Sequence, residues 1–183
     1  FPCSFLQFYT IIIFREVIMK YILNHLKIVN DLLANEQVQK LRLYKHHHAY
    51  TRFEHCLSVS YYSYLICKFL NLDYISAARA GLLHDLFFYD CECKSTRPKS
   101  HLKNHPKISL YNAQKILCLN KIEKDIILKH MWPITIIPPR FLESYIVCFV
   151  DKFCALREFF FFCTFRNQFF PLILALQFLS LYH

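Results

Sequence analysis

An adjacent histidine and aspartate, His84-Asp85, close an apolar stretch that begins at Ala77. Burying an imidazole and a carboxylate among apolar side chains is costly unless a partner satisfies them, and a bound metal ion is a common partner. Other residues with metal-binding side chains lie in apolar stretches of their own, namely His55, His105, His130 and Asp151. Four histidines and two aspartates converging from separate helices would make a nitrogen and oxygen site for one or two transition metals.

Short sequence motifs surround these six residues. They are Arg52-x-x-His55-x-Leu57-x-Val59, Ala80-Gly81-Leu82-Leu83-His84-Asp85, His105-Pro106 followed by Ala113, Ile126-Ile127-Leu128-Lys129-His130, and Val150-Asp151-Lys152. The order of these motifs and the residues within them resemble those of the HD-domain superfamily of metal-dependent phosphohydrolases, in particular its small clostridial-type members. The resemblance covers roughly residues 44–158.

The resemblance implies an all-α fold, a compact bundle of five to six or more helices around the metal site. It also implies that His55, His84, Asp85 and Asp151 hold a first metal, and that His105 and His130 complete a second. Asp85 would bridge the two metals and, with His84, count as catalytic. Mixed histidine and carboxylate ligation fits Fe, Mn, Co or Ni, with Zn and Mg as further options. The expected reaction is attack of a metal-activated water on a phosphomonoester or phosphodiester of a nucleotide or similar small substrate.

Four basic residues are candidates for binding the substrate phosphate. Arg52 lies one turn before His55 on the same predicted helix face, and Lys152 follows Asp151 directly. Lys103 and Lys107 flank the expected start of a helix at His105, where free N–H groups and the helix dipole favour an anion. Nearby loop charges Lys94, Arg97 and Lys99 add to this positive region.

The other histidines are predicted to lie outside the site. We expect His25 and His101 at the surface. The run His46-His47-His48 falls in a predicted loop and is expected to be solvent-exposed or, at most, to border the pocket.

Composition independently favours packed helices. The chain of 183 residues is the size of one domain, is 55% hydrophobic, and has a single glycine, which argues against a turn-rich β fold. The net charge of +9 suits either a small anionic partner or a solvated surface. No groove-reading motif or basic-aromatic strand pattern indicates a specific nucleic acid partner. Most of the nine cysteines fall in predicted helices, which favours a reducing cytoplasm.

Apolar periodicity predicts six helices. A break is expected near Ala34-Asn35, and Asp73 is a candidate N-cap. Residues 89–104 read as a long exposed loop that borders the site and sets specificity, and residues 134–139 read as extended. The predicted helices span residues 21–43, 53–69, 73–88, 105–119, 121–130 and 141–158.

The two ends differ from the middle. Met19 is the first methionine. The possible codons for Arg15-Glu16-Val17-Ile18-Met19 include a DNA sequence that contains a purine-rich ribosome-binding site just before a start codon. Residues 1–18 are therefore predicted to be an untranslated or mis-annotated leader, and residues 19–158 the HD domain. Residues 159–183 read as an apolar tail, either a frameshift product or a membrane-associating segment. Leu172–Leu181 is too short to span a bilayer.

Two other functions are compatible with the same residues. A non-catalytic nucleotide-binding or sensory HD module would keep the fold, although loss of a ligand would be its expected mark and no ligand is missing. A di-iron oxygenase on the same scaffold would contain iron and consume oxygen. The Gly-Tyr-Pro motif of the cyclic-di-GMP branch is absent, which disfavours that substrate.

Overall fold

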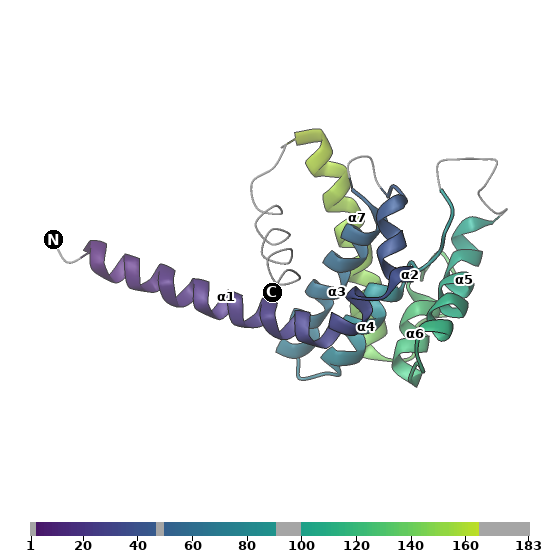
Figure 1. The fold of residues 1–183 in the computed structure, drawn as a ribbon, viewed down its shortest axis with the longest axis horizontal. Helices are drawn as coiled ribbons and strands as arrows, with labels where there is room; N and C mark the ends of the chain where they lie inside the picture. Colours follow the sequence, from purple (N-terminus) through teal and green to yellow (C-terminus); the bar gives the residue numbers. More distant parts are fainter. Residues whose placement is uncertain (1–2, 47–49, 91–99, 165–183) are drawn as a thin grey trace.

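The computed structural model of the protein describes residues 3–46, 50–90 and 100–164 (Figure 1). Within these ranges the fold is all-helical, as predicted, and β-structure is limited to an isolated antiparallel bridge between Lys45 and Thr51. The helices are α1 (Cys3–Leu33), α2 (Glu36–Gln39), a 3-10 helix η1 (Lys40–Leu43), α3 (Arg52–Phe69), α4 (Tyr74–Leu83), α5 (His101–Ile116), α6 (Lys121–Lys129) and α7 (Leu142–Thr164).

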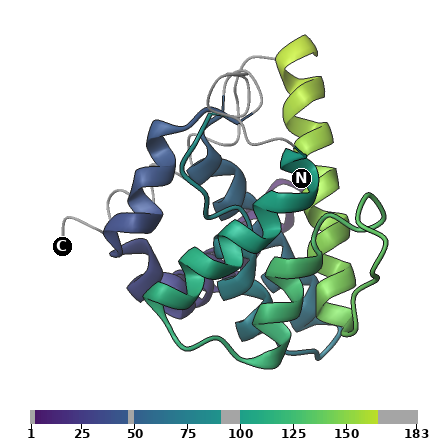
Figure 2. The same cartoon turned by 90° about the vertical axis from the view of Figure 1, so that its right-hand side faces the viewer.

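The centre of the bundle is the pair α3 and α4, and α7 and α6 pack against this pair. Gly81 of α4 lets the two central helices approach closely, because a Cβ atom there would lie 3.0 Å from Cα of Ser60 on α3. Helix α6 also contacts α5, and both lie at the end of the bundle far from the N-terminus of α1 (Figure 1), the end that faces the viewer in Figure 2. The close packing of α3 on α4 brings His55 of α3 beside the His84-Asp85 pair.

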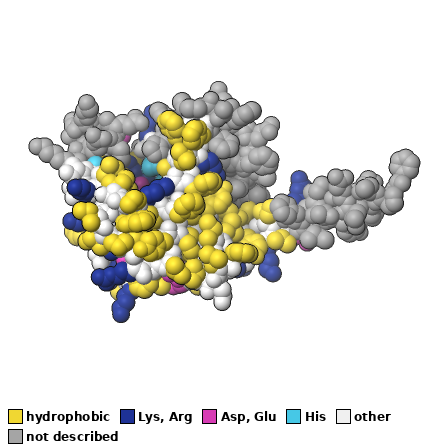
Figure 3. Space-filling view, turned by 180° about the vertical axis from the view of Figure 1, so that it is seen from behind, with side chains coloured by type: hydrophobic (Ala, Val, Ile, Leu, Met, Phe, Trp, Pro, Cys, Tyr) yellow, Lys and Arg dark blue, Asp and Glu magenta, His cyan; other side chains and the backbone are white. Residues whose placement is uncertain are grey.

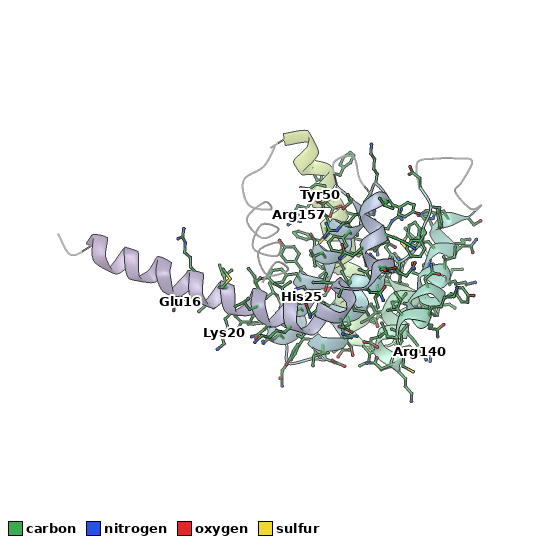
Figure 4. All side chains as sticks on the ribbon, in the orientation of Figure 1. Glu16, Lys20, His25, Tyr50, Arg140 and Arg157 are labelled. Atoms are coloured by element: carbon green, nitrogen blue, oxygen red, sulfur yellow. The ribbon has the colours of Figure 1, made fainter. Side chains whose placement is uncertain are left out.

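Helix α1 has two parts with different surroundings. Its C-terminal part packs into the core through Ile22, Leu26, Val29 and Leu32. Its N-terminal part extends away from the bundle, and Figure 4 labels Glu16 and Lys20 along this part and His25 where the helix enters the body. Helix α1 runs continuously through Met19, and the prediction that residues 1–18 are an untranslated leader stays a prediction.

Local sequence signals explain several helix ends. The predicted break at Asn35 is confirmed, because its side chain accepts a hydrogen bond from the Gln37 N–H and caps α2. Asp73 caps α4 as predicted, by accepting from the Ser76 N–H at 3.0 Å. Thr51 starts α3 with a capping box, in which its hydroxyl and the Glu54 carboxylate each bond the other's backbone N–H.

Other predicted boundaries were wrong. Helix α4 ends at Leu83 rather than near residue 88, and α5 begins at His101, four residues before His105. Pro106 therefore lies in the second turn of α5 rather than the first. Residues 134–137 form a turn and bends rather than an extended segment. Helix α7 continues through Glu158 to Thr164, so the predicted tail begins inside a helix.

Apolar side chains cover much of the face shown in Figure 3. Exposed apolar residues also lie along α7, namely Leu142, Phe149, Phe153, Leu156 and Phe160. Among the described residues, no helix combines the length and the apolar character needed to cross a bilayer.

Candidate metal centre

All six predicted ligands converge at the middle of the bundle. His55 lies in the first turn of α3, His84 is the C-cap of α4, and Asp85 follows it. His105 lies on α5, His130 is the C-cap of α6, and Asp151 lies in the middle of α7. The four histidines are buried, whereas the side chains of Asp85 and Asp151 remain 8% and 13% exposed. The open side of the cluster is therefore lined by carboxylates.

One group of ligand atoms comes from Asp85, His105 and His130. Oδ1 of Asp85 lies 3.3 Å from Nε2 of His105 and 3.4 Å from Nε2 of His130. The two Nε2 atoms lie 2.8 Å from each other. Three side chains from three segments thus point one donor atom each at a common position.

A second group consists of His55, His84 and Asp85, whose ligand atoms lie within 4.8 Å of one another. Asp151 adjoins this group, because its Oδ1 is 3.0 Å from Nε2 of His55 and 3.4 Å from Nε2 of His84. Asp85 belongs to both groups, in the position of the bridging ligand that the resemblance implies. These clusters are consistent with bound metal, whose number and identity the structure leaves open.

The ring orientations of three histidines are fixed by their own helices. Nδ1 of His84 donates to the Gly81 carbonyl at 2.8 Å. Nδ1 of His105 donates to the His101 carbonyl at 3.0 Å, and Nδ1 of His130 donates to the Ile127 carbonyl at 2.8 Å. Because a carbonyl only accepts, each Nδ1 carries the proton. Nε2 of each neutral ring therefore presents a lone pair to the centre, which is the tautomer that metal ligation needs.

These lone pairs need a positive charge between them. The Nε2 atoms of His105 and His130 face each other at hydrogen-bonding distance, although neither neutral ring has a proton left to share there. Nε2 of His84 and Oδ1 of Asp85 are also buried without a hydrogen-bond partner. Buried acceptors that lack donors are costly, and a cation would satisfy all of them at once. The donor set therefore fits a transition-metal ion with nitrogen and oxygen ligands.

Without such a cation, protons bound to the histidines must supply the positive charge. Burial opposes charge on His55, but the carboxylates of Glu158 and Asp151 outweigh this effect and raise its pKa to about 10. Burial likewise opposes charge on His84, and mainly Asp85 holds its pKa well above the usual value. Burial would raise the pKa of Asp85, but His84 and the rings of His105 and His130 hold it well below its usual range. Metal binding would thus displace protons from the histidines.

The structure adds two residues that sequence reasoning missed. Glu158, buried on α7, places its carboxylate oxygens 3.0 and 3.2 Å from Nδ1 of His55. His46, which was expected to be exposed or at most to border the pocket, is half-buried and stacks on the His55 ring with centroids 4.0 Å apart. Ligand atoms of these three residues also lie within 4.8 Å of one another. The spacing of seven residues between Asp151 and Glu158 was the available signal, because it places both on one helix face.

Arg52 is buried close to the site, but its guanidinium bonds the protein backbone. Nη1 donates to the Phe87 carbonyl at 2.8 Å and Nη2 to the Tyr89 carbonyl at 3.1 Å. The guanidinium also lies 3.7 Å from the centre of the Phe87 ring. Arg52 thereby fixes the segment that follows Asp85, and its contact with substrate stays a prediction.

The predicted lysines differ in position. Lys103 and Lys107 are exposed, and their spacing places them on the side of α5 away from His105. The start of α5 at His101 also removes the predicted helix N-terminus at His105. Lys152 lies nearer, with Nζ 3.9 Å from Oδ2 of Asp151, and it donates to the His130 carbonyl at 2.8 Å. The structure thus brings Lys152 to the ligand cluster and leaves Lys103 and Lys107 on the outer surface of α5.

Two other histidines were predicted to lie at the surface, and this prediction was wrong for His25. His25 is fully buried between helices, and Nε2 lies 2.8 Å from the Ser60 hydroxyl. His101 is half-buried, stacks on the His105 ring at 4.6 Å, and pairs through Nδ1 with the Tyr89 hydroxyl at 2.8 Å. His101 and Tyr89 therefore lie beside the candidate ligand His105.

Several predicted features lie outside the described residues. They are His47 and His48, the charged loop residues Lys94, Arg97 and Lys99, and the part of the apolar tail from residue 165 onward. The structure leaves the predictions made for them untested.

The chain was compared with known proteins in three ways. A scan against protein-family models, a search of curated proteins and a search of solved structures each found no match.

Proposed function

We propose that the protein is a metal-dependent phosphohydrolase of the HD-domain type, acting on a phosphomonoester or phosphodiester of a nucleotide or a similar small molecule. The order of ligands along the chain and their placement on five different helical segments both support this assignment. The five cysteines whose side chains the structure describes are free thiols, which agrees with a reducing cytoplasmic location as part of the proposal.

One observation carries the proposal. Asp85 is shared by two groups of buried ligand atoms, and unprotonated Nε2 atoms face it from His84, His105 and His130. A structural zinc site would use four protein ligands, often thiolates, and would leave no coordination position open. A carboxylate shared by two histidine-rich groups is instead the arrangement expected of a two-metal hydrolytic centre.

His55, His84, Asp85 and Asp151 would hold one ion, and His105 and His130 would hold a second ion together with Asp85. Metal ions held there would polarise a phosphate oxygen and lower the pKa of a bound water. The protein's own groups would orient the ligands and surround the reacting atoms. The backbone carbonyls fix the three histidine tautomers, and Arg52 holds the segment after Asp85 in place.

The substrate would enter from the side where carboxylates are partly exposed. Lys152 lies on this side with a side chain that is 39% exposed, next to Asp151. Its ammonium group would attract an anionic phosphoester towards the ligands. On the other side, the rings of His101 and Tyr89 adjoin His105 and offer a surface for the leaving group.

A screen of the purified full-length chain tests the proposal. The protein would be loaded separately with Mn²⁺, Fe²⁺, Co²⁺ and Ni²⁺ and offered mononucleotides, cyclic dinucleotides, dinucleoside polyphosphates and a generic phosphodiester. We expect metal-dependent release of phosphate or of a nucleotide, abolished in Asp85→Ala. Metal binding with tight nucleotide binding but no turnover would instead indicate a sensory module. Oxygen consumption by the iron form without hydrolysis would indicate an oxygenase.

A further inference from the structure

The carboxylate of Glu158 occupies an unusual place beside the candidate metal centre. It is 1% exposed, lies on α7 two turns after Asp151, and contacts Nδ1 of His55 at 3.0 and 3.2 Å. Nε2 of the same ring faces Oδ1 of Asp151 at 3.0 Å. One face of α7 therefore contacts both nitrogens of a single histidine.

The other ligand histidines use a different partner. Nδ1 of His84 and His130 donates to a carbonyl three residues earlier, in the last turn of α4 and of α6. Carbonyls in the last turn of a helix lack an intrahelical N–H partner, so the helix itself provides the acceptor. His105, in the interior of α5, likewise donates to the carbonyl of His101.

His55 lies in the first turn of α3 and does not use a carbonyl of its own helix for Nδ1. The groups left over at a helix start are N–H donors, not carbonyl acceptors. The carbonyl of Thr51, four residues earlier, accepts the backbone N–H of His55 at 3.1 Å. Nδ1 of His55 instead contacts the carboxylate of Glu158 on α7.

We infer that Glu158 is a positioning residue for the metal centre: its carboxylate holds the proton on Nδ1 of His55, so that Nε2 is directed at the metal beside Asp151. A carboxylate partner also makes the ring a more basic ligand, and loss of such a partner costs about 10- to 100-fold in metal affinity. This inference rests on the proposed function only in assuming that His55 is a metal ligand.

Cobalt binding by the full-length chain tests the role of Glu158. The Kd for Co²⁺ and the visible absorption of the bound ion would be measured for the wild type, Glu158→Ala and Glu158→Gln. Glu143→Gln is a matched control, because Glu143 is a buried glutamate on the same helix that accepts from the Asp73 N–H, away from the ligands. Circular dichroism would establish folding of each variant.

We expect Glu158→Ala to raise the Kd by about 10- to 100-fold and to alter the Co²⁺ absorption. Glu158→Gln keeps an acceptor without the charge, so its loss should be near tenfold. Glu143→Gln should bind as the wild type does. A folded Glu158→Ala variant with wild-type Kd and spectrum would overturn the inference. If that variant does not fold, unchanged binding by Glu158→Gln would overturn it.

The same experiment separates this inference from the proposed function. Wild-type protein that binds Co²⁺ through Glu158-dependent ligation but hydrolyses no phosphoester would leave the inference standing and refute the proposed function. Equal binding by the wild type and Glu158→Ala, with phosphoester hydrolysis intact in both, would refute the inference alone. Wild-type protein that binds no metal would refute both.

Discussion

The buried His25 should make the stability of the fold depend on pH. Its Nε2 donates to the Ser60 hydroxyl at 2.8 Å, because that hydroxyl itself donates to the Ala78 carbonyl at 2.7 Å. Nδ1 is buried without a partner, so a proton there would create a charge that nothing compensates. Burial accordingly lowers the pKa of His25 from 6.5 to about 4.

The expected magnitude follows from the two pKa values. Below pH 6.5 the unfolded chain binds a proton at this imidazole, whereas the folded protein does not until the pH approaches 4. The free energy of unfolding therefore falls as the pH falls through this window. A shift of one pKa unit corresponds to ~1.4 kcal/mol, so lowering the pH to about 5 should remove about 2 kcal/mol through His25 alone.

Urea unfolding of the wild type and His25→Gln, with a chelator present, would measure this contribution. Glutamine keeps an N–H for Ser60 but has no proton to gain, and the remaining histidines titrate alike in both proteins. Between pH 7 and 5 the wild type should lose about 2 kcal/mol more than the variant. Parallel pH profiles for the two proteins would refute the reasoning, because they would show that the His25 ring accepts its proton without penalty.

Three other substitutions test the packing and the ligand groups. His130→Ala removes one of the two ligand groups, so the metal content by mass spectrometry should fall to about one ion per chain, and an unchanged content would mean that His130 binds none. Gly81→Ala places a methyl group 3.0 Å from Cα of Ser60. The cost of overpacking, about 1–3 kcal/mol, should outweigh the gain in helix propensity of about 1 kcal/mol, so a denaturant melt should show a lower free energy of unfolding. A stabilised variant would show that α3 and α4 can separate freely. Thr51→Ala should cost about 1 kcal/mol through loss of the α3 capping box, and no change in the melt would show that the cap does not stabilise the helix.

Much of the fold could be predicted because local chemistry sets it. Apolar periodicity placed the helices, and the caps at Asn35 and Asp73 form as the residue types require. The end of α4 could not be predicted from the same pattern, because the apolar residues Leu86 and Phe87 are buried beyond the helix. A run of apolar residues indicates burial and leaves the backbone conformation open.

The six candidate ligands that the sequence indicated lie close together in the structure, but their supporting contacts could not be predicted. The burial of His25 depends on the Ser60 hydroxyl, which lies 35 residues away in the chain. The pairing of Glu158 with His55 spans 103 residues and joins α7 to the start of α3. Arg52 donates hydrogen bonds to the backbone carbonyls of Phe87 and Tyr89, and backbone carbonyls carry no sequence signal.

Metal binding by the purified full-length chain tests the central claim most directly. Equilibrium dialysis against Mn²⁺ or Co²⁺, followed by elemental analysis, would be done for the wild type and Asp85→Ala. Because Asp85 belongs to both ligand groups, we predict about one to two ions per wild-type chain, a higher melting temperature with metal, and loss of both effects in the variant. A wild-type chain that binds no ion, or an Asp85→Ala variant that binds as many as the wild type, would contradict the account.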